Sequence, residues 1–243
     1  IAAGVRYLRF SRGYLWLLLL GSLFGFASAS LRSMLPNLTS DTLGGGSMMY
    51  GVLLGLFGCG AMVGGVTRSQ ASSRLGPNLL PICIVVFGLA GIVVGLSTQV
   101  ALTAVFVTIA GVIWTWILAT LNSTYQVLTP DWVRGRTMGA FTLSVFGFVP
   151  MGAVASGVLG NSIGADKALV AFSVAVAAIG VLSFRMPIPV LERIESPVVP
   201  ERDPTTIPDV EASTEPVLVI TTWHVGELDL DAFLKVLSDL RRV

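Results

Sequence analysis

Six long runs of apolar residues follow one another along the chain before residue 185. Charged residues, glycine and proline clusters or polar turns separate them, and each run is close to the roughly 20 helical residues that cross the hydrocarbon core of a bilayer. The runs are continuous and too long for the alternating strands of a membrane β-barrel. The pattern therefore predicts an all-α membrane domain. Its six predicted spans are 14–36, 47–66, 79–96, 102–125, 138–160 and 168–184.

The pattern changes after the sixth run. Prolines interleaved with acidic residues predict an extended linker at 187–215. The segment PVLVITTWHV is typical of a β-strand, and 229–242 of an amphipathic helix. One strand and one helix cannot enclose a core. We expect either that further elements are missing after Val243 or that this unit pairs with another copy.

The predicted organisation therefore has four parts. They are a cytoplasmic lead-in at 1–13, a six-helix transmembrane domain at 14–186, the linker at 187–215 and a partial α+β cytoplasmic unit at 216–243. Because the chain begins with Ile1 and shows no signal peptide, we expect it to be a piece of a longer protein.

Composition agrees with a membrane protein, since 53% of residues are hydrophobic and only 12% are charged. A soluble domain of this length could not bury so much apolar surface around one core. Basic residues dominate as far as Val190 and acidic residues dominate afterwards. The connections on one side of the predicted spans carry almost all the arginines, so both termini are predicted to be cytoplasmic. The arginines on that side are Arg6, Arg9, Arg12, Arg68, Arg74, Arg134, Arg136 and Arg185.

A polar turn at 129–136 separates the fourth and fifth runs. Thr129 followed by Pro130 is a helix-start signal, because the hydroxyl can cap free N–H groups and proline fits the first turn. Arg134 and Arg136 follow closely. We interpret the segment as a loop at the membrane surface.

The fourth run carries a polar stripe. Thr108, Thr115, Asn122 and Gln126 recur at helical spacing, with Trp114 beside them. Polar groups inside a membrane are costly unless they face protein or water, so the stripe indicates a substrate-lined cavity. The alternative is hydrogen bonding between helices, which small polar residues commonly provide. We favour that alternative for the threonines, and for Ser28 of the first run, and leave both open for Asn122 and Gln126.

The first run has a parallel stripe of Gly21, Gly25, Ser28 and Arg32. Arg32 is the only charged residue well inside a predicted span. Its side chain either extends to the outer interface or binds an anion within the membrane. Since no span contains Asp or Glu, a proton-relaying carboxylate cannot be placed in this chain.

Glycines crowd the second run, which predicts close helix packing, and Pro150 between glycines in the fifth run predicts a kink or hinge. Cys59 and Cys83 fall inside apolar runs and are interpreted as small packing residues. No nucleophile elbow, phosphate-binding loop or metal cluster is apparent, so we expect no enzyme activity, cofactor, metal or nucleic-acid partner.

These features resemble the C-terminal half of a major facilitator superfamily transporter. The segment Pro130-Asp131-Trp132-Val133-Arg134-Gly135-Arg136 is similar to the P-D-x-x-R-G-R turn between the tenth and eleventh helices. It is nearest to the branch of the enterobactin exporter and the transmembrane secretion effectors. Ser73-Arg74-Leu75-Gly76 occupies the place of a D-R-x-G loop motif, with serine in place of the acid. Gly147-x-x-Pro150-x-Gly152 is similar to the glycine-proline pattern of the exporter helix.

The resemblance implies that the first, second, fourth and fifth spans line a cavity, with the third and sixth outside. It implies alternating access between two six-helix halves, the other being a missing N-terminal portion or a second chain that would carry any proton-coupling acid. The expected function is proton-coupled efflux of small amphipathic molecules, of siderophore or drug type, by an antiporter in a bacterial inner membrane. The alternative is a non-transporting membrane scaffold whose tail dimerises.

Candidate site residues follow from the stripes and the motifs. Those expected to contact substrate are Asn122, Gln126, Arg32, Thr115 and Trp114. Those expected to act in gating are Asp131, Arg134, Gly135, Arg136, Arg74, Gly76 and Pro150.

Overall fold

The computed structural model describes residues 12–129 and 134–185. The chain separates into two compact units, Ile1–Ile194 and Glu195–Val243. All the described residues belong to the first unit. The predicted linker, the predicted strand and helix of the tail, and most of the lead-in lie outside the described residues, as does Asp131.

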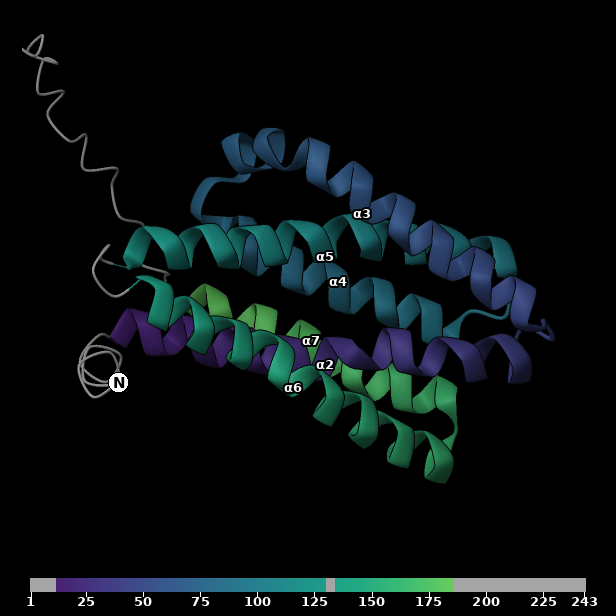
Figure 1. Cartoon of the computed structure of the whole chain (residues 1–243). Coiled ribbons are helices and arrows are strands. Elements are labelled where there is room, and N and C mark those ends of the chain that lie inside the picture. Colours follow the sequence, from purple (N-terminus) through teal and green to yellow (C-terminus); the bar gives the residue numbers. More distant parts are fainter. Residues whose placement is uncertain (1–11, 130–133, 186–243) are drawn as a thin grey trace, which may run out of the picture. The chain divides into compact units, whose positions relative to one another are not determined.

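Six α-helices make up the described part of the first unit (Figure 1). They are α2 (Arg12–Asp41), α3 (Ser47–Leu75), α4 (Leu79–Leu96), α5 (Val100–Leu128), α6 (Arg134–Ile163) and α7 (Ala165–Arg185), with a short 3₁₀ turn, η1 (Gly76–Asn78), between α3 and α4. Each predicted span lies inside one of these helices. The all-α prediction is therefore confirmed.

Five continuous helical stretches are long and apolar enough to cross a membrane. One of them, Ser47–Leu96, comprises 50 residues and contains both α3 and α4. About 20 residues suffice for one crossing, so this stretch accounts for two. The η1 turn divides it, because Gly76 adopts a positive φ of 51° that favours glycine and ends α3.

Several helices extend beyond the predicted spans. α2 continues through Pro36 to Asp41, and α3 continues past Val66 to Leu75. Polar residues end a membrane span without ending its helix, since the helix backbone satisfies its own hydrogen bonds in water as in lipid. Consequently, Arg68 and Arg74 lie on the last turns of α3, whereas the sequence had suggested that they lie in a loop between two spans.

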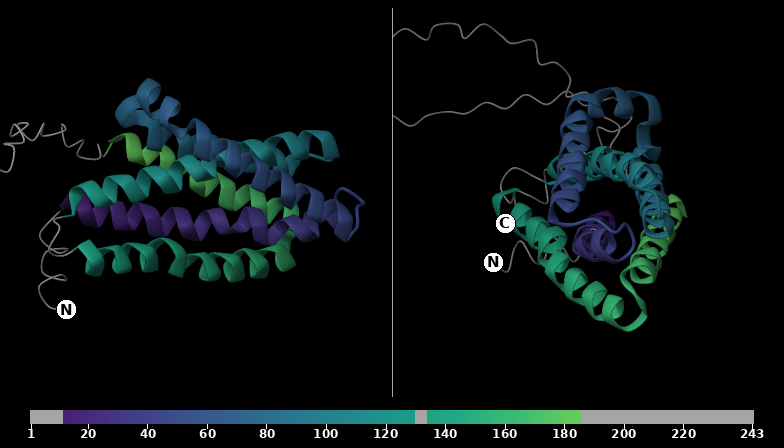
Figure 2. Two further views of the ribbon diagram at one scale, coloured as in Figure 1. Left: turned by 45° about the horizontal axis from the view of Figure 1, so that its top comes forward. Right: turned by 90° about the vertical axis from the view of Figure 1, so that its right-hand side faces the viewer.

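The helices pack in three close pairs, α2 with α6, α3 with α5 and α4 with α7. In the end-on view of Figure 2, α2 runs inside the other helices, and it contacts each of them. Its buried side chains form one part of a continuous apolar core. They include Leu17, Leu20, Phe24, Leu31, Leu35 and Leu38.

Glycines bring the paired backbones together. A Cβ atom at Gly60 of α3 would collide with the carbonyl oxygen of Thr108, and one at Gly111 of α5 would collide with the carbonyl oxygen of Phe57. Gly152 of α6 meets the backbone of Phe26 in the same way. The packing prediction for the second span is thus confirmed at Gly60 and Gly64, whereas Gly51, Gly55, Gly58 and Gly65 face open space.

The third span is packed more deeply than its aliphatic sequence had suggested. α4 buries most of its side chains against α5 and α7, and its large exposed side chains are Leu89 and Leu96. Cys83 is buried in this helix and is a packing residue, as predicted. Cys59 is exposed on α3, so the same prediction is wrong for Cys59 within the described part of the chain.

Candidate substrate cavity

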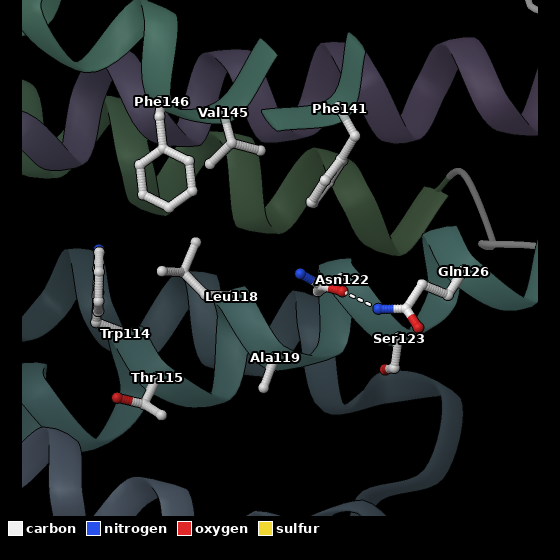
Figure 3. Close-up of a pocket in the computed structure, with 10 residues that line it drawn as sticks. All are labelled: Trp114, Thr115, Leu118, Ala119, Asn122, Ser123, Gln126, Phe141, Val145 and Phe146. Atoms are coloured by element: carbon white, nitrogen blue, oxygen red, sulfur yellow. Dashed lines mark hydrogen bonds between the residues drawn. The ribbon is translucent and has the colours of Figure 1, made fainter. Parts of the chain in front are cut away.

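A cavity of about 520 Å³ lies between α5 and α6. Figure 3 shows the side chains of the two helices facing each other across it. α5 supplies Trp114, Thr115, Leu118, Ala119, Asn122, Ser123 and Gln126, and α6 supplies Phe141, Val145 and Phe146. The wall from α6 is wholly apolar, while the wall from α5 is mixed. A molecule in this cavity would therefore meet rings and methyl groups on one side and amide groups on the other.

Helical periodicity explains why α5 presents this wall. Positions 115, 119, 122 and 126 follow one face of an α-helix, and the opposite face carries the buried residues Ile117, Leu121 and Tyr125. The side-chain amide of Gln126 donates a hydrogen bond to the amide oxygen of Asn122, one turn earlier. Both residues are exposed. In the described part of the chain they bond to each other and not to a neighbouring helix, which favours the cavity interpretation over helix-to-helix bonding.

The threonines of the same stripe behave differently. The hydroxyl of Thr108 donates to the carbonyl of Ala104 at 2.8 Å, and that of Thr115 donates to the carbonyl of Gly111 at 3.2 Å. Each hydroxyl is thus satisfied within its own helix. Thr115 lines the cavity, whereas Thr108 does not.

Arg32 lies beside the cavity and is not among its lining residues. Its guanidinium carbon is 4.8 Å from the ring centroid of Trp114 and 6.0 Å from that of Phe57. These distances are those of cation–π contacts. Trp114 is about 21 Å from the start of α5 at the helical rise of roughly 1.5 Å per residue, so the guanidinium lies deep in the helix bundle. These contacts favour a position of Arg32 within the helix bundle over extension to the outer interface.

The two glycines of the Arg32 stripe pack against α6, and Ser28 bonds within its own helix. Gly21 and Gly25 meet Val145, and the Ser28 hydroxyl donates to the Gly25 carbonyl at 3.5 Å. The neighbouring Ser33 exchanges a 2.8 Å hydrogen bond with Ser156 of α6. This face of α2 therefore holds two helices together, and Arg32 is the member that points elsewhere.

Two further groups at the site were missed from the sequence. Arg68 of α3 donates through Nη2 to the carbonyl of Ala119, at 3.1 Å, and to the hydroxyl of Ser123, at 2.6 Å. It thereby ties the end of α3 to the polar wall of the cavity. A sequence pattern showing that the helix continues through Thr67 and Arg68 would have placed this arginine on a helix, but it would not have identified the partners of its hydrogen bonds.

The second missed group is Tyr125, which is fully buried. Its hydroxyl donates to the carbonyl of Thr137 at 2.8 Å, and its ring centroid is 4.5 Å from that of Phe141. Because Thr137 is in the first turn of α6, this contact joins the end of α5 to the start of α6 next to the cavity.

Comparison with known families decides what kind of protein carries this cavity. The family model described as transmembrane secretion effector matches residues 1–243, the whole chain. The chain belongs to the transmembrane secretion effector family. This confirms the resemblance to a major facilitator superfamily transporter half, and it identifies a multi-pass membrane protein with a role in transport. No curated protein and no solved structure matches the chain.

Apart from Asp131, which lies outside the described residues, the expected gating residues fall in three places. Gly135 is exposed at the start of α6, and Arg134 and Arg136 occupy the same turn, with side chains outside the described part of the structure. Arg74 and Gly76 lie at the connection between α3 and α4, where α3 ends. Pro150 is inside α6, which remains helical through it. Thr129 ends α5, its hydroxyl donating to the Tyr125 carbonyl at 2.7 Å. The helix start predicted from Thr129 and Pro130 falls on residues that the structure does not describe.

The cavity therefore brings together four of the expected substrate residues, Trp114, Thr115, Asn122 and Gln126, with Arg32 adjacent. α4 and α7 contribute no lining residue among the described ones. Of the four spans expected to line the pathway, α5 and α6 do so directly. α2 and α3 reach it through the contacts of Arg32 and Phe57 with Trp114.

Proposed function

We propose that this chain forms one half of a secondary active transporter that exports small amphipathic molecules across a bacterial cytoplasmic membrane. The observation that carries the proposal is the two-sided cavity between α5 and α6. Its volume of about 520 Å³ is within the range of about 300–1,000 Å³ that is usual for small-molecule sites.

The chemistry of the two walls defines the substrate class. Phe141, Val145 and Phe146 offer apolar surface that stabilises rings or alkyl groups by burial. Asn122 and Gln126 are joined by one hydrogen bond, from the Gln126 amide nitrogen to the Asn122 oxygen, and their other donors and acceptors are exposed, so a substrate can bond to them. A molecule with one apolar and one polar side fits both walls.

Alternating access requires a second wall that moves against this one. The other half, either an N-terminal portion or a second chain, would provide it. The coupling acid would also come from that half. The two carboxylates among the described residues, Asp41 and Asp166, lie at the end of α2 and in the first turn of α7, away from the cavity.

Gating would act through the turn that contains Arg134 and Arg136. This turn is the first turn of α6, and the Tyr125–Thr137 hydrogen bond fixes the start of α6 to the end of α5. A movement of the turn is therefore transmitted to the helices that form both walls of the cavity. With both termini in the cytoplasm, the turn faces the cytoplasmic side, where release of the gate would admit substrate.

A transport assay tests the proposal. The intact protein in vesicles with an imposed proton gradient should move amphipathic dyes outward, and a protonophore should abolish the movement. The double change Asn122→Ala with Gln126→Ala should reduce transport at least several-fold, because it removes the amides of the polar wall. The matched control, Gln70→Ala with Asn161→Ala, removes two exposed amides that do not line the cavity and should leave transport unchanged.

Two results would contradict the proposal in different ways. Equal transport by the two double variants would show that the cavity is not the substrate site. Absence of any gradient-dependent transport by the intact protein would favour the non-transporting scaffold.

A further inference from the structure

Arg32 is a cation without a counter-ion in the described part of the chain. It forms no ion pair or hydrogen bond there, and its contacts are the ring faces of Trp114 and Phe57. The described acids, Asp41 and Asp166, lie near helix ends. A charge inside a membrane is costly unless it is paired or reaches water, so a guanidinium kept at this depth indicates a function.

The N–H groups of Arg32 also remain available. No Arg32 nitrogen is among the fully buried side-chain atoms that lack a partner in the described structure. Since no hydrogen bond from the described residues engages these nitrogens either, they keep accessible surface and unused donors. Arg68 is different, because its Nη2 is held by Ala119 and Ser123 and its Nε is buried. Of these two arginines, Arg32 is therefore the one that is free to bind a ligand.

The aromatic rings hold the guanidinium in place. Phe57 comes from α3 and Trp114 from α5, and their ring centroids are 6.0 Å apart. Their backbones are fixed by the close glycine contacts at Gly60 and Gly111. The cation is thus positioned by side chains of two closely packed helices, and no carboxylate of the described residues compensates its charge.

We propose that Trp114, which lines the cavity, and Arg32, which lies beside it against the Trp114 ring, form an anion subsite, and that the transported molecules are amphipathic anions that carry a carboxylate, sulfonate or similar group. A guanidinium binds such planar or forked oxyanions with paired hydrogen bonds. The body of the molecule would lie along Phe146, Val145 and Phe141, and its other polar groups would reach Asn122 and Gln126. This inference rests on the proposed function and adds the sign of the substrate charge.

Two probes with the same ring system test the inference. Anilinonaphthalene sulfonate is an amphipathic anion, and phenylnaphthylamine is its neutral counterpart. Binding of each to the intact protein is measured by energy transfer from tryptophan. Arg32→Gln should weaken sulfonate binding by roughly 10-fold or more, the loss expected from one charge-assisted hydrogen bond, and should change the neutral probe by less than about twofold. Arg185→Gln is the matched control, since it removes an exposed arginine at the end of α7 and should affect neither probe.

Other outcomes overturn the inference. If Arg32→Gln weakens both probes equally, Arg32 has a structural role or pairs with a carboxylate of the other half. If it weakens neither, the subsite does not exist. Should Arg32→Gln fail to fold, Arg32→Lys keeps the charge but loses the fork, and it should weaken sulfonate binding selectively by a smaller factor. Equal losses for the two probes in that variant would also overturn the inference.

The failure of this inference can be told apart from failure of the proposed function. If the intact protein transports the neutral probe but shows no dependence on Arg32 for the anion, only the anion subsite is wrong. If it transports neither probe under a proton gradient, the proposed function is wrong as well.

Discussion

The interface between α3 and α5 gives the sharpest quantitative prediction. At Gly60, an added methyl group would overlap the carbonyl oxygen of Thr108. Because this oxygen belongs to the backbone of α5, it can move away only if α3 and α5 separate. At Gly55, about one and a half turns earlier on the same helix, nothing lies within 4 Å of the added atom. Gly60→Ala and Gly55→Ala are therefore the same chemical change in two environments.

The expected magnitudes follow from this difference. Replacing glycine by alanine inside a helix stabilises it by about 0.5–1 kcal/mol, because alanine loses less backbone entropy on folding. Gly55→Ala should show this gain. At Gly60 the gain is offset by overpacking, which costs about 1–3 kcal/mol. Because both variants share the gain, they should differ by the overpacking cost, about 1–3 kcal/mol in the free energy of unfolding, with Gly60→Ala below the parent protein.

Thermal unfolding of the purified protein in detergent measures the difference. Because the same interface positions Phe57 against Trp114 and Arg32, Gly60→Ala should also weaken binding of anilinonaphthalene sulfonate, whereas Gly55→Ala should not. A Gly60→Ala protein as stable as the parent, with unchanged probe binding, would refute the close approach of the two helices.

Two further changes test the contacts around the cavity. Tyr125→Phe keeps the ring against Phe141 but removes the hydrogen bond to the Thr137 carbonyl. The variant should be less stable by about 1 kcal/mol in thermal unfolding, and amide hydrogen exchange at the start of α6 should be faster. Unchanged exchange there would contradict a link between the two helices. Arg68→Gln removes the bonds to Ala119 and Ser123, so it should speed exchange in the last two turns of α3, while Arg74→Gln, which removes an exposed arginine, should not. Equal exchange rates in these two arginine variants would show that Arg68 does not fasten α3 to α5.

The helices could be predicted because their signal is local. A continuous apolar run of bilayer length has one backbone solution in lipid, so every predicted span lies within a helix. The ends were predicted less well. α2 passes through Pro36 and α3 passes through Arg68, since a polar residue marks the membrane boundary and not the end of the helix.

The polar wall of the cavity could also be predicted, because Asn122 and Gln126 share one helical face and polar groups in a span must face something polar. The apolar wall could not. Phe141 and Phe146 look the same in sequence whether they face a cavity, a neighbouring helix or lipid, and the choice depends on where α5 packs. The direction of Arg32 was likewise undetermined, since its partners Phe57 and Trp114 come from two other helices.

The central claim is that the face of α5 bearing Asn122 lines an aqueous substrate pathway. It is tested most directly by thiol accessibility. In a protein whose exposed Cys59 and buried Cys83 are replaced by alanine, Asn122→Cys is treated with a membrane-impermeant, charged thiol reagent. Leu89→Cys, at an exposed apolar position of α4 that does not line the cavity, is the control for a lipid-facing position.

We predict that the cysteine at position 122 is modified and that anilinonaphthalene sulfonate slows its modification, while the cysteine at position 89 is unreactive. A position 122 as unreactive as position 89 would place this face of α5 against lipid or another protein surface and would contradict the account.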